Sequence, residues 1–540
     1  MKFFTVQRKH HTLFLVLLLL LGFQSYAQKP KVVVVINVEN MRPEYIQRYY
    51  YNLLDGGLKR LVDQGALCSN TRNYINDQNI EAATATLFTG NYPTLHGVVN
   101  SDWLNRVNNK IENASTNKNY QTVGGDSNEG QKSADQLLCN TLGDELKLTS
   151  NGRSKVYSVS TRAETAIFSA GHAADGAFWM ENTSGNMISS SYYIDQFPFW
   201  ALSFNNKKLA QNALDDKWKL LFLNPVSYKA SADDYSDFEK GYDKRCTFPY
   251  DLQKIYDQTG DFSLFKHTPA ANHIITDFAI NIFDKAFLGT DKHPDLLTVN
   301  YSSLNGLFGP QSLETEDFYI RLDKDIARLV THIEEAVGKQ NMLVVISSVC
   351  AENYTSDYLA SQKLPNGTVR PDNIAALLRS FLNATYGQGN WVQEVVDQEI
   401  YLNRDLIKEK GIDYNEMATK SAELVNQFAG VNMAVPSRIF MQGNFANGPL
   451  RSMSNSFNFQ RSGDISYSIL PSWQTAYKFQ KKLHTTDNRI SLLFWGGGIK
   501  PSNHMEETEA IDMVPTILYL LGEAQPQSCQ GKVIQLQITD

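Results

Sequence analysis

The chain has 540 residues, of which 42% are hydrophobic and 20% are charged, and its formal net charge at pH 7 is −7. This length and composition are enough for a large folded core with inserted subdomains. The acidic balance, without a basic stripe anywhere in the sequence, excludes the usual kind of nucleic-acid-binding surface.

The first 27 residues have the pattern of a secretory signal peptide. Basic residues precede a short apolar run over residues 13–23, and the small residues Ser25 and Ala27 end it. The run is too short to span a membrane, and no later segment reaches that length. We therefore expect an exported chain that begins near Gln28, has no transmembrane segment, and is periplasmic or associated with the outer membrane.

The chain contains five widely spaced cysteines: Cys68, Cys139, Cys246, Cys350 and Cys529. An oxidising compartment permits disulfides, but this spacing gives no CxxC or zinc-knuckle pattern. Because five is an odd number, at least one thiol is free or pairs outside the chain.

Apolar runs rich in β-branched residues predict strands that are buried on both faces of a sheet. Helical patterns alternate with these runs, which predicts an α/β fold with a doubly wound, mostly parallel sheet sandwiched by helices. In such sheets ligands bind outside the carboxyl ends of the strands. The predicted strands are residues 31–38, 296–300, 342–347 and 490–495, and the predicted helices include residues 43–61, 317–337 and 512–521.

Two regions interrupt this alternation. Residues 180–270 are rich in aromatic residues, Asn, Asp and Ser without a sustained period, and residues 355–480 contain mixed short elements, including an amphipathic stretch over 414–428. We interpret both as insertions within one domain that spans residues 28–540, because no linker or repeat divides the chain.

Short segments in a fixed order give the chain a family resemblance. Together they resemble the alkaline phosphatase superfamily, most closely the periplasmic phosphate-irrepressible alkaline phosphatases of Bacteroidota. The resemblance implies the α/β sandwich predicted above and a site where Asp and His side chains hold two zinc ions beside a Thr or Ser nucleophile. The segments are residues 38–42 (VENMR), 87–97, 102–103, 170–179, 308–310 (FGP), 319–323 (YIRLD), 461–464 (RSGD) and 512–516 (DMVPT).

The resemblance places the nucleophile at Ile80, whose side chain cannot attack phosphorus. Thr84 and Thr86 lie on the same predicted helix, but a hydroxyl one turn away would be displaced from the metals. We therefore interpret both threonines as structural residues of the helix, and the alternative is a relocated nucleophile at Thr84.

The positions that contact phosphate in the family are also changed. The Asn position aligns with Ser101, although Asn100 is adjacent, and the Lys and Arg positions align with Arg162 and Glu164. Glu164 places a negative charge where a dianionic ester would bind, which opposes binding.

The metal positions implied by the resemblance are mostly unfilled. Glu39 replaces an Asp and is one methylene longer, and Val349 and Cys350 replace an Asp-His pair. Residues 299–310 contain neither Asp nor His, although the family has a ligand pair there. Cys350 is either a zinc-binding thiolate or, as we favour, a buried free thiol. His484 matches the last metal-binding His only across a shortened loop, and the alternative is an ordinary surface histidine.

We therefore expect an exported protein with this fold that is catalytically inactive, needs no cofactor, and acts as a binding or scaffold component of the cell envelope. Its partner would be another envelope protein or a glycan, bound by aromatic residues of the insertions; the alternative for these aromatic residues is core packing. The alternative function is a divergent phosphomonoesterase or phosphodiesterase that depends on zinc. Its candidate groups are Glu39, Asp102, His172, Cys350 and His484.

Overall fold

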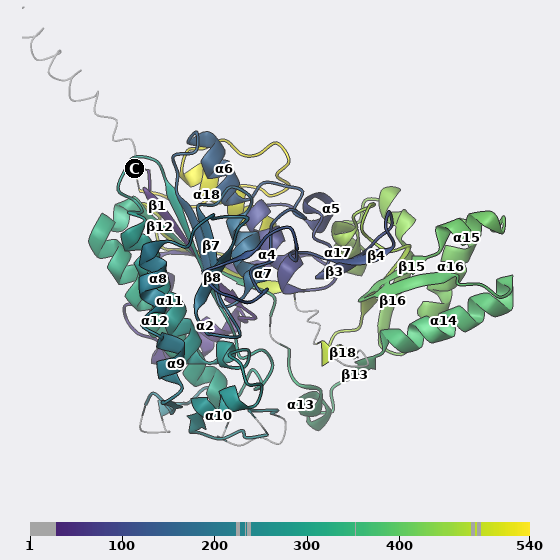
Figure 1. Ribbon diagram of the computed structural model, residues 1–540, viewed down its shortest axis with the longest axis horizontal. Helices are drawn as coiled ribbons and strands as arrows, with labels where there is room; N and C mark the ends of the chain where they lie inside the picture. Colours follow the sequence, from purple (N-terminus) through teal and green to yellow (C-terminus); the bar gives the residue numbers. More distant parts are fainter. Residues whose placement is uncertain are drawn as a thin grey trace, which may run out of the picture.

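The computed structural model describes residues 29–539 except for 223–226, 233, 235–238, 243, 352, 477–480 and 483–487. The predicted signal peptide and His484 therefore lie outside the described residues. Figure 1 shows a large body built around a sheet and a smaller lobe that projects from one side of it. In the described part of the chain, no helix has the length and apolarity needed to cross a membrane.

The body is organised around a mixed sheet with the strand order β21-β2-β20-β12-β1-β11-β6-β7-β8-β5, and β22 also pairs with β2. β1 pairs in parallel with both β11 and β12, and the parallel pairing continues through β6 to β7. The strands are β1 (Val32–Glu39), β2 (Ala66–Arg72), β5 (Thr122–Val123), β6 (Val156–Ser160), β7 (Gly176–Met180), β8 (Met187–Ser190), β11 (Asp295–Tyr301), β12 (Met342–Val349), β20 (Arg489–Gly496), β21 (Ser502–His504) and β22 (Thr508–Glu509).

The two faces of the sheet are covered by different helices. α11 (Pro269–Lys285) and α12 (Leu313–Val337) pack on one face, and α4 (Ile80–Thr89), α7 (Ala163–Ala170) and α18 (Met513–Leu520) pack on the other. Alternate residues of β1 enter the two cores: Val34 and Ile36 join the first, and Val33 and Val35 join the second. This arrangement explains why the strand has no polar residue before Asn37.

Two predicted elements differ from the structure. The predicted strand 490–495 is β20, but it runs antiparallel to β12, so its carboxyl end lies at the opposite edge from the tips of β1 and β12. The predicted helix 43–61 is broken into α2 (Glu44–Arg48), a 3-10 turn (Tyr50–Asn52) and α3 (Leu58–Gln64). The break is stabilised by the buried carboxylate of Asp323, which accepts hydrogen bonds from the backbone N–H groups of Leu54 and Leu58.

The smaller lobe lies within residues 355–480 and has a hydrophobic core of its own. Its antiparallel sheet has the order β14-β15-β17-β16, and helices cover it. Its elements are β14 (Val392–Val396), β15 (Glu399–Leu402), α14 (Pro371–Tyr386), α15 (Arg404–Glu409), α16 (Tyr414–Val425), β16 (Val431–Pro436), a 3-10 turn (Ser437–Met441), α17 (Gly448–Ser456) and β17 (Ile465–Ile469).

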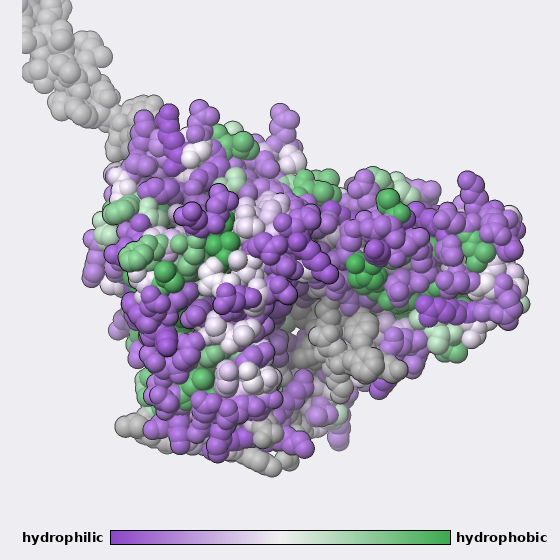
Figure 2. Space-filling model, viewed as in Figure 1, coloured by the Kyte–Doolittle hydropathy of each residue, from purple (hydrophilic) through white to green (hydrophobic). Residues whose placement is uncertain are grey.

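Residues 180–270 pack onto the body instead of forming a separate core. Trp218, Tyr250, Phe262 and Phe265 are buried in the same cluster as α11 and α12. Phe199 is a contrasting case, with 82% of its surface exposed. Figure 2 shows a mostly hydrophilic surface on this side of the molecule, with apolar residues in small groups. Burial of these four rings favours the core-packing interpretation of this region over the docking interpretation. The region comprises α8 (Phe199–Asn205), α9 (Leu209–Ala213), β9 (Lys217–Trp218), β10 (Tyr250–Asp251) and α10 (Leu252–Asp257).

Candidate functional site

The tips of β1 and β12 meet at one edge of the sheet, where sequence reasoning places the site. Glu39, the last residue of β1, lies opposite Val349 of β12. Asn40 then adopts a left-handed conformation with φ of 56°, and its N–H donates to the Val349 carbonyl at 2.9 Å. Its side-chain amide donates to the Ser303 hydroxyl, just beyond β11, at 3.0 Å. Three neighbouring strand ends are thereby joined at this edge.

Glu39 is fully buried and bonded to the body, since the Thr165 hydroxyl of α7 donates to its carboxylate at 2.6 Å. Burial raises the pKa of Glu39, and the positive charge of Arg162 only partly offsets this effect. A buried carboxyl with a raised pKa is a poorer cation ligand than a solvated one, because it must lose its proton to bind.

Val349 and Cys350, at the tip of β12, are not ready to bind a metal. Val349 is apolar and buried. Cys350 has φ of 62°, and its thiol donates to the backbone carbonyl of Gln78 at 2.9 Å. Burial raises the pKa of the Cys350 thiol well above its usual value, so the sulfur remains protonated at neutral pH. These contacts support the interpretation of Cys350 as a buried free thiol.

Helix α4 begins at Ile80, the aligned nucleophile position. Asn79 caps the helix by accepting a hydrogen bond from the Ala82 N–H at 2.8 Å, so Ile80 occupies the first turn. The side chain of Thr84 is buried, and no described residue contacts its hydroxyl at hydrogen-bond distance. Thr86 is also buried and donates to the Ala82 carbonyl at 2.7 Å. Neither threonine presents a hydroxyl to solvent.

The positions that the resemblance assigns to phosphate contact lie in a charge-paired cluster at the start of α7. The ammonium group of Lys132 donates to the Glu164 carboxylate at 2.8 Å, and the guanidinium of Arg162 approaches the same carboxylate at 4.0 Å. Although burial opposes ionisation, Lys132 and Arg162 hold the pKa of Glu164 to about 2. The cluster therefore carries an internal counter-charge where the resemblance implies an anion-binding pair.

Ser101, the aligned Asn position, precedes a hairpin of β3 (Asp102–Asn105) and β4 (Lys110–Asn113). Its backbone N–H donates to the side chain of Asn100 at 2.8 Å. Asn100 in turn approaches the carboxylate of Asp77 at 3.5 Å, in the loop before α4. Asn100 is therefore held by its neighbours in a polar network of the body.

Two residues near the site were missed by sequence reasoning, Lys266 and His267. Both sit at the end of a 3-10 turn (Phe265–His267) before α11. Burial lowers the pKa of Lys266 to about 8, with Glu129 and Glu164 opposing the shift. Burial lowers the pKa of His267 to about 4, and its Nδ1–H donates to the Ser303 carbonyl at 2.9 Å. The sequence signal for these two residues was limited to an adjacent Lys and His before a Thr-Pro pair that begins a helix.

The described residues do not fit the zinc pair that the resemblance implies. In the part of the chain that the structure describes, no group of three or more His, Cys, Asp and Glu side chains is placed to hold a metal ion. His172 bonds through Nδ1 to the Tyr192 hydroxyl at 3.1 Å, and Asp102 accepts from the Asn113 side chain at 3.1 Å. These two candidates are thus bonded to other partners and are not assembled with Glu39 and Cys350 into such a group.

Comparisons with known proteins agree with the fold and identify relatives with which the site can be compared. Residues 33–491 match the family described as type I phosphodiesterase / nucleotide pyrophosphatase. Alkaline phosphatase PafA of Elizabethkingia meningoseptica is 30% identical over 520 residues, which cover 94% of each chain. The crystal structure of wild-type PafA superposes with a TM-score of 0.88 at 29% identity, over 94% of this chain and 98% of that one. The predicted α/β sandwich is therefore confirmed.

A second crystal structure of PafA carries substitutions at four residues. It superposes with a TM-score of 0.86 at 29% identity, over 94% of this chain and 98% of that one. The substituted residues are a threonine, an asparagine, a lysine and an arginine, with the last two separated by one residue. The same residue types, in the same order, are those that the resemblance assigns to the positions of Ile80, Ser101, Arg162 and Glu164.

Proposed function

Because the chain belongs to the type I phosphodiesterase / nucleotide pyrophosphatase family, we propose that it is a family member that has lost ester hydrolysis. We further propose that it acts as an exported binding or scaffold component of the cell envelope. A fold of this kind can keep its packing without its site, because the sheet cores do not depend on the residues at the strand tips.

The observation that carries this proposal is the missing nucleophile. Ile80 has no group that can attack phosphorus, and Thr84 and Thr86 of the same helix are fully buried. Covalent phosphoryl transfer needs an exposed nucleophile beside the ester, so neither threonine replaces the lost group.

The electrostatics of the strand tips support the same conclusion. Glu164 uses the charges of Lys132 and Arg162 that would otherwise attract a phosphate ester. Among the described residues of the paired tips of β1 and β12, Glu39 is the carboxylate donor, because the Cys350 thiol is neutral and Val349 is apolar. One buried carboxylate does not assemble a two-metal site.

A divergent hydrolase is the second candidate, and two observations favour it. The chain is about 30% identical to a protein named as an alkaline phosphatase, over 94% of its length. In addition, His267 is tied to Ser303, which also accepts from Asn40, so a neutral imidazole lies close to the tip of β1. A neutral histidine is suited to proton transfer in a rearranged site.

Zinc content and turnover test the proposal together. The mature chain, beginning at Gln28, is purified without chelators, its zinc is measured by elemental analysis, and hydrolysis of 4-nitrophenyl phosphate and bis(4-nitrophenyl) phosphate is followed at alkaline pH. PafA, prepared in parallel, is the positive control. We expect less than one zinc per chain and the same background rate for the wild type and Glu39→Gln. Stoichiometric zinc with turnover that Glu39→Gln abolishes would overturn the proposal.

The location and partner need separate measurements. Cell fractionation with an antibody to the mature chain should place the protein in the periplasmic or outer-membrane fraction. Crosslinking in intact cells, followed by mass spectrometry, should then recover an envelope protein or a glycan-bearing species. Recovery of the chain in the cytoplasm with its first 27 residues intact would contradict the export part of the proposal.

A further inference from the structure

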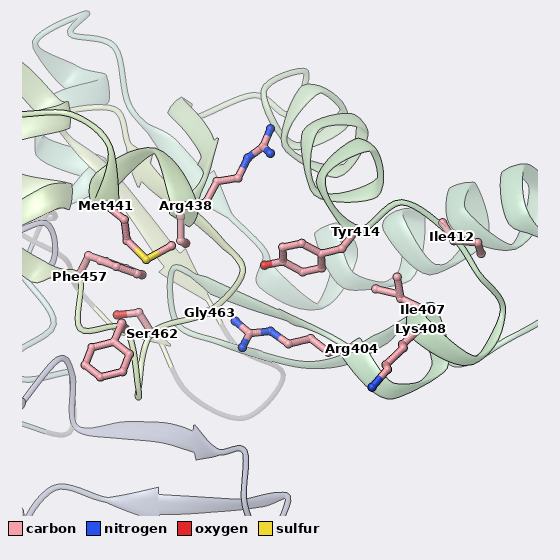
Figure 3. A pocket seen from close by; sticks show the side chains of 12 residues that line it. Arg404, Ile407, Lys408, Ile412, Tyr414, Arg438, Met441, Phe457, Ser462 and Gly463 are labelled. Carbon is pink, nitrogen blue, oxygen red and sulfur yellow. The ribbon is translucent and has the colours of Figure 1, made fainter.

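A cavity lies in the smaller lobe, away from the strand tips of the body. Its volume is about 570 Å³, which is within the usual range of small-molecule sites. It is bounded by α15, the start of α16, the 3-10 turn Ser437–Met441 and the loop that carries Ser462 and Gly463. Figure 3 shows Arg404 and Tyr414 on one side of this cavity and Met441 and Phe457 on the other.

The charged residues that line the cavity are all cationic: Arg404, Lys408 and Arg438, with no Asp or Glu among the lining residues. The guanidinium of Arg438 is turned toward α16, where it approaches the Thr419 hydroxyl at 3.4 Å, and Arg404 faces the cavity. A cavity with this composition is a local site of positive charge on a chain whose net charge is −7. It attracts anions.

A buried carboxylate beside the cavity, Asp464, positions Arg404 without neutralising the cavity. Asp464 is fully buried and accepts hydrogen bonds from Arg404 at 2.8 Å and from the Tyr414 hydroxyl at 2.6 Å. It also accepts from Arg106 at 3.0 Å and from the Leu402 N–H at 2.7 Å. One negative charge thus faces two guanidinium groups, and 49% of the Arg404 side chain remains exposed.

The opposite wall of the cavity is apolar. Met441 and Phe459 are 66% and 67% exposed, and Phe457 lies beside them. Exposed apolar groups of this size lose contact with water when a ligand covers them, which contributes to binding. The cavity therefore combines a cationic side, fixed by a buried carboxylate, with an aromatic and thioether side that adapts to ligand shape.

We propose that this cavity binds a small amphiphilic anion. Its carboxylate or phosphate head would lie on Arg404, and its apolar body would lie on Met441, Phe457 and Phe459. Arginine suits either oxyanion because it is permanently charged and carries five N–H donors. Nε and Nη2 of Arg404 face Asp464, so the remaining N–H groups of its guanidinium are the donors for the ligand. This inference concerns the lobe alone, and it holds whether or not the strand tips of the body hydrolyse esters.

Isothermal titration calorimetry of the mature chain tests whether binding requires an anionic head group. It uses four probes that share one alkyl body. The probes are octanoate, octyl phosphate, octanol and octyltrimethylammonium, and acetate is added as a head without a body. We expect octanoate or octyl phosphate to bind, more weakly as salt rises, and the ratio of their dissociation constants to identify the preferred head. Octanol binding as tightly as both anions would overturn the proposal, as would acetate binding as tightly as octanoate.

Variants locate the binding in the cavity. Arg404→Gln should weaken binding of the preferred anion about tenfold, and Phe459→Ala should weaken it severalfold. Lys410→Gln is the matched control, because Lys410 is an exposed cation at the end of the same helix, outside the cavity lining. If Arg404→Gln lowers the melting temperature, the affinity of Phe459→Ala is the deciding measurement, because the Phe459 side chain is largely exposed and contributes little to folding. Unchanged affinity in Phe459→Ala, or equal losses in Lys410→Gln, would refute the assignment.

Discussion

The thiol of Cys350 donates a 2.9 Å hydrogen bond to the backbone carbonyl of Gln78, joining the tip of β12 to the loop before α4. Burial raises the pKa of this thiol, so we predict slow alkylation of Cys350 by iodoacetamide in the native protein at mildly alkaline pH. The partly exposed Cys139, Cys246 and Cys529 should be labelled first. Timed labelling with peptide mass spectrometry measures the order, and unfolded protein provides the fully labelled reference. Labelling of Cys350 as fast as Cys246 would show that its thiol is accessible.

Thr84 and Thr86 lie two residues apart on α4, and we expect their substitutions to change the free energy of unfolding in opposite directions. Replacing Thr84 with Val removes a buried hydroxyl that has no described partner, so we expect the free energy of unfolding to rise by about 1 kcal/mol. Replacing Thr86 with Val removes a hydroxyl that donates to Ala82 and lies 3.0 Å from His96, so we expect a loss of about 1–2 kcal/mol. Urea denaturation measures both. Destabilisation by Thr84→Val would mean that its hydroxyl has a partner.

Glu164 gives a pH-dependent prediction. Its pKa is about 2 in the folded chain, against roughly 4.3 for an unfolded glutamate, so it stabilises the fold above the unfolded value. That contribution is lost as the pH falls from about 4 toward about 2. We expect Glu164→Gln to lower the free energy of unfolding by about 2 kcal/mol at neutral pH, and the difference from wild type to shrink on acidification. A difference that stays constant from pH 6 to pH 3 would contradict this linkage.

Arg461 is predicted to be a structural residue of the joint between body and lobe. Its guanidinium donates to the backbone carbonyls of Gly97 and Gln136 at 2.6 Å and lies 4.6 Å from the centre of the Trp103 ring. Arg461→Ala leaves both carbonyls without this donor, and we expect a loss of about 3 kcal/mol in unfolding free energy. The exposed Arg153 supplies the control substitution, Arg153→Ala, which should change stability by less than about 0.5 kcal/mol.

The fold was predictable because its central strands have a clear sequence pattern. A strand buried on both faces needs an unbroken apolar run, and β1, β11 and β12 each provide one. The direction of β20 was not predictable, since an apolar run has the same pattern in parallel and antiparallel pairing. The break in the helix predicted over 43–61 depends on Asp323, far along the chain, and such a tertiary contact leaves no mark in a local pattern.

Less of the site could be predicted. The resemblance identified Ile80, Cys350 and Glu164 as positions of interest, but it gave no information on what each side chain contacts. The pairing of Glu164 with Lys132 joins residues on separate elements, and only folding brings them together. Lys266 was overlooked for the same reason, because its pKa is lowered by burial and the sequence alone does not show that this lysine is buried.

The hydrogen bonds that converge on Asp464 have a mechanical consequence. Arg106 reaches it from the loop between β3 and β4 of the body, and Arg404, Tyr414 and Leu402 reach it from the lobe. If the hairpin and the lobe moved apart, the buried carboxylate of Asp464 would lose its hydrogen bond from Arg106. A ligand that changes the contacts of Arg404 is therefore thermodynamically linked to the position of the hairpin. By reciprocity, a molecule that binds the hairpin changes the affinity of the lobe for its ligand.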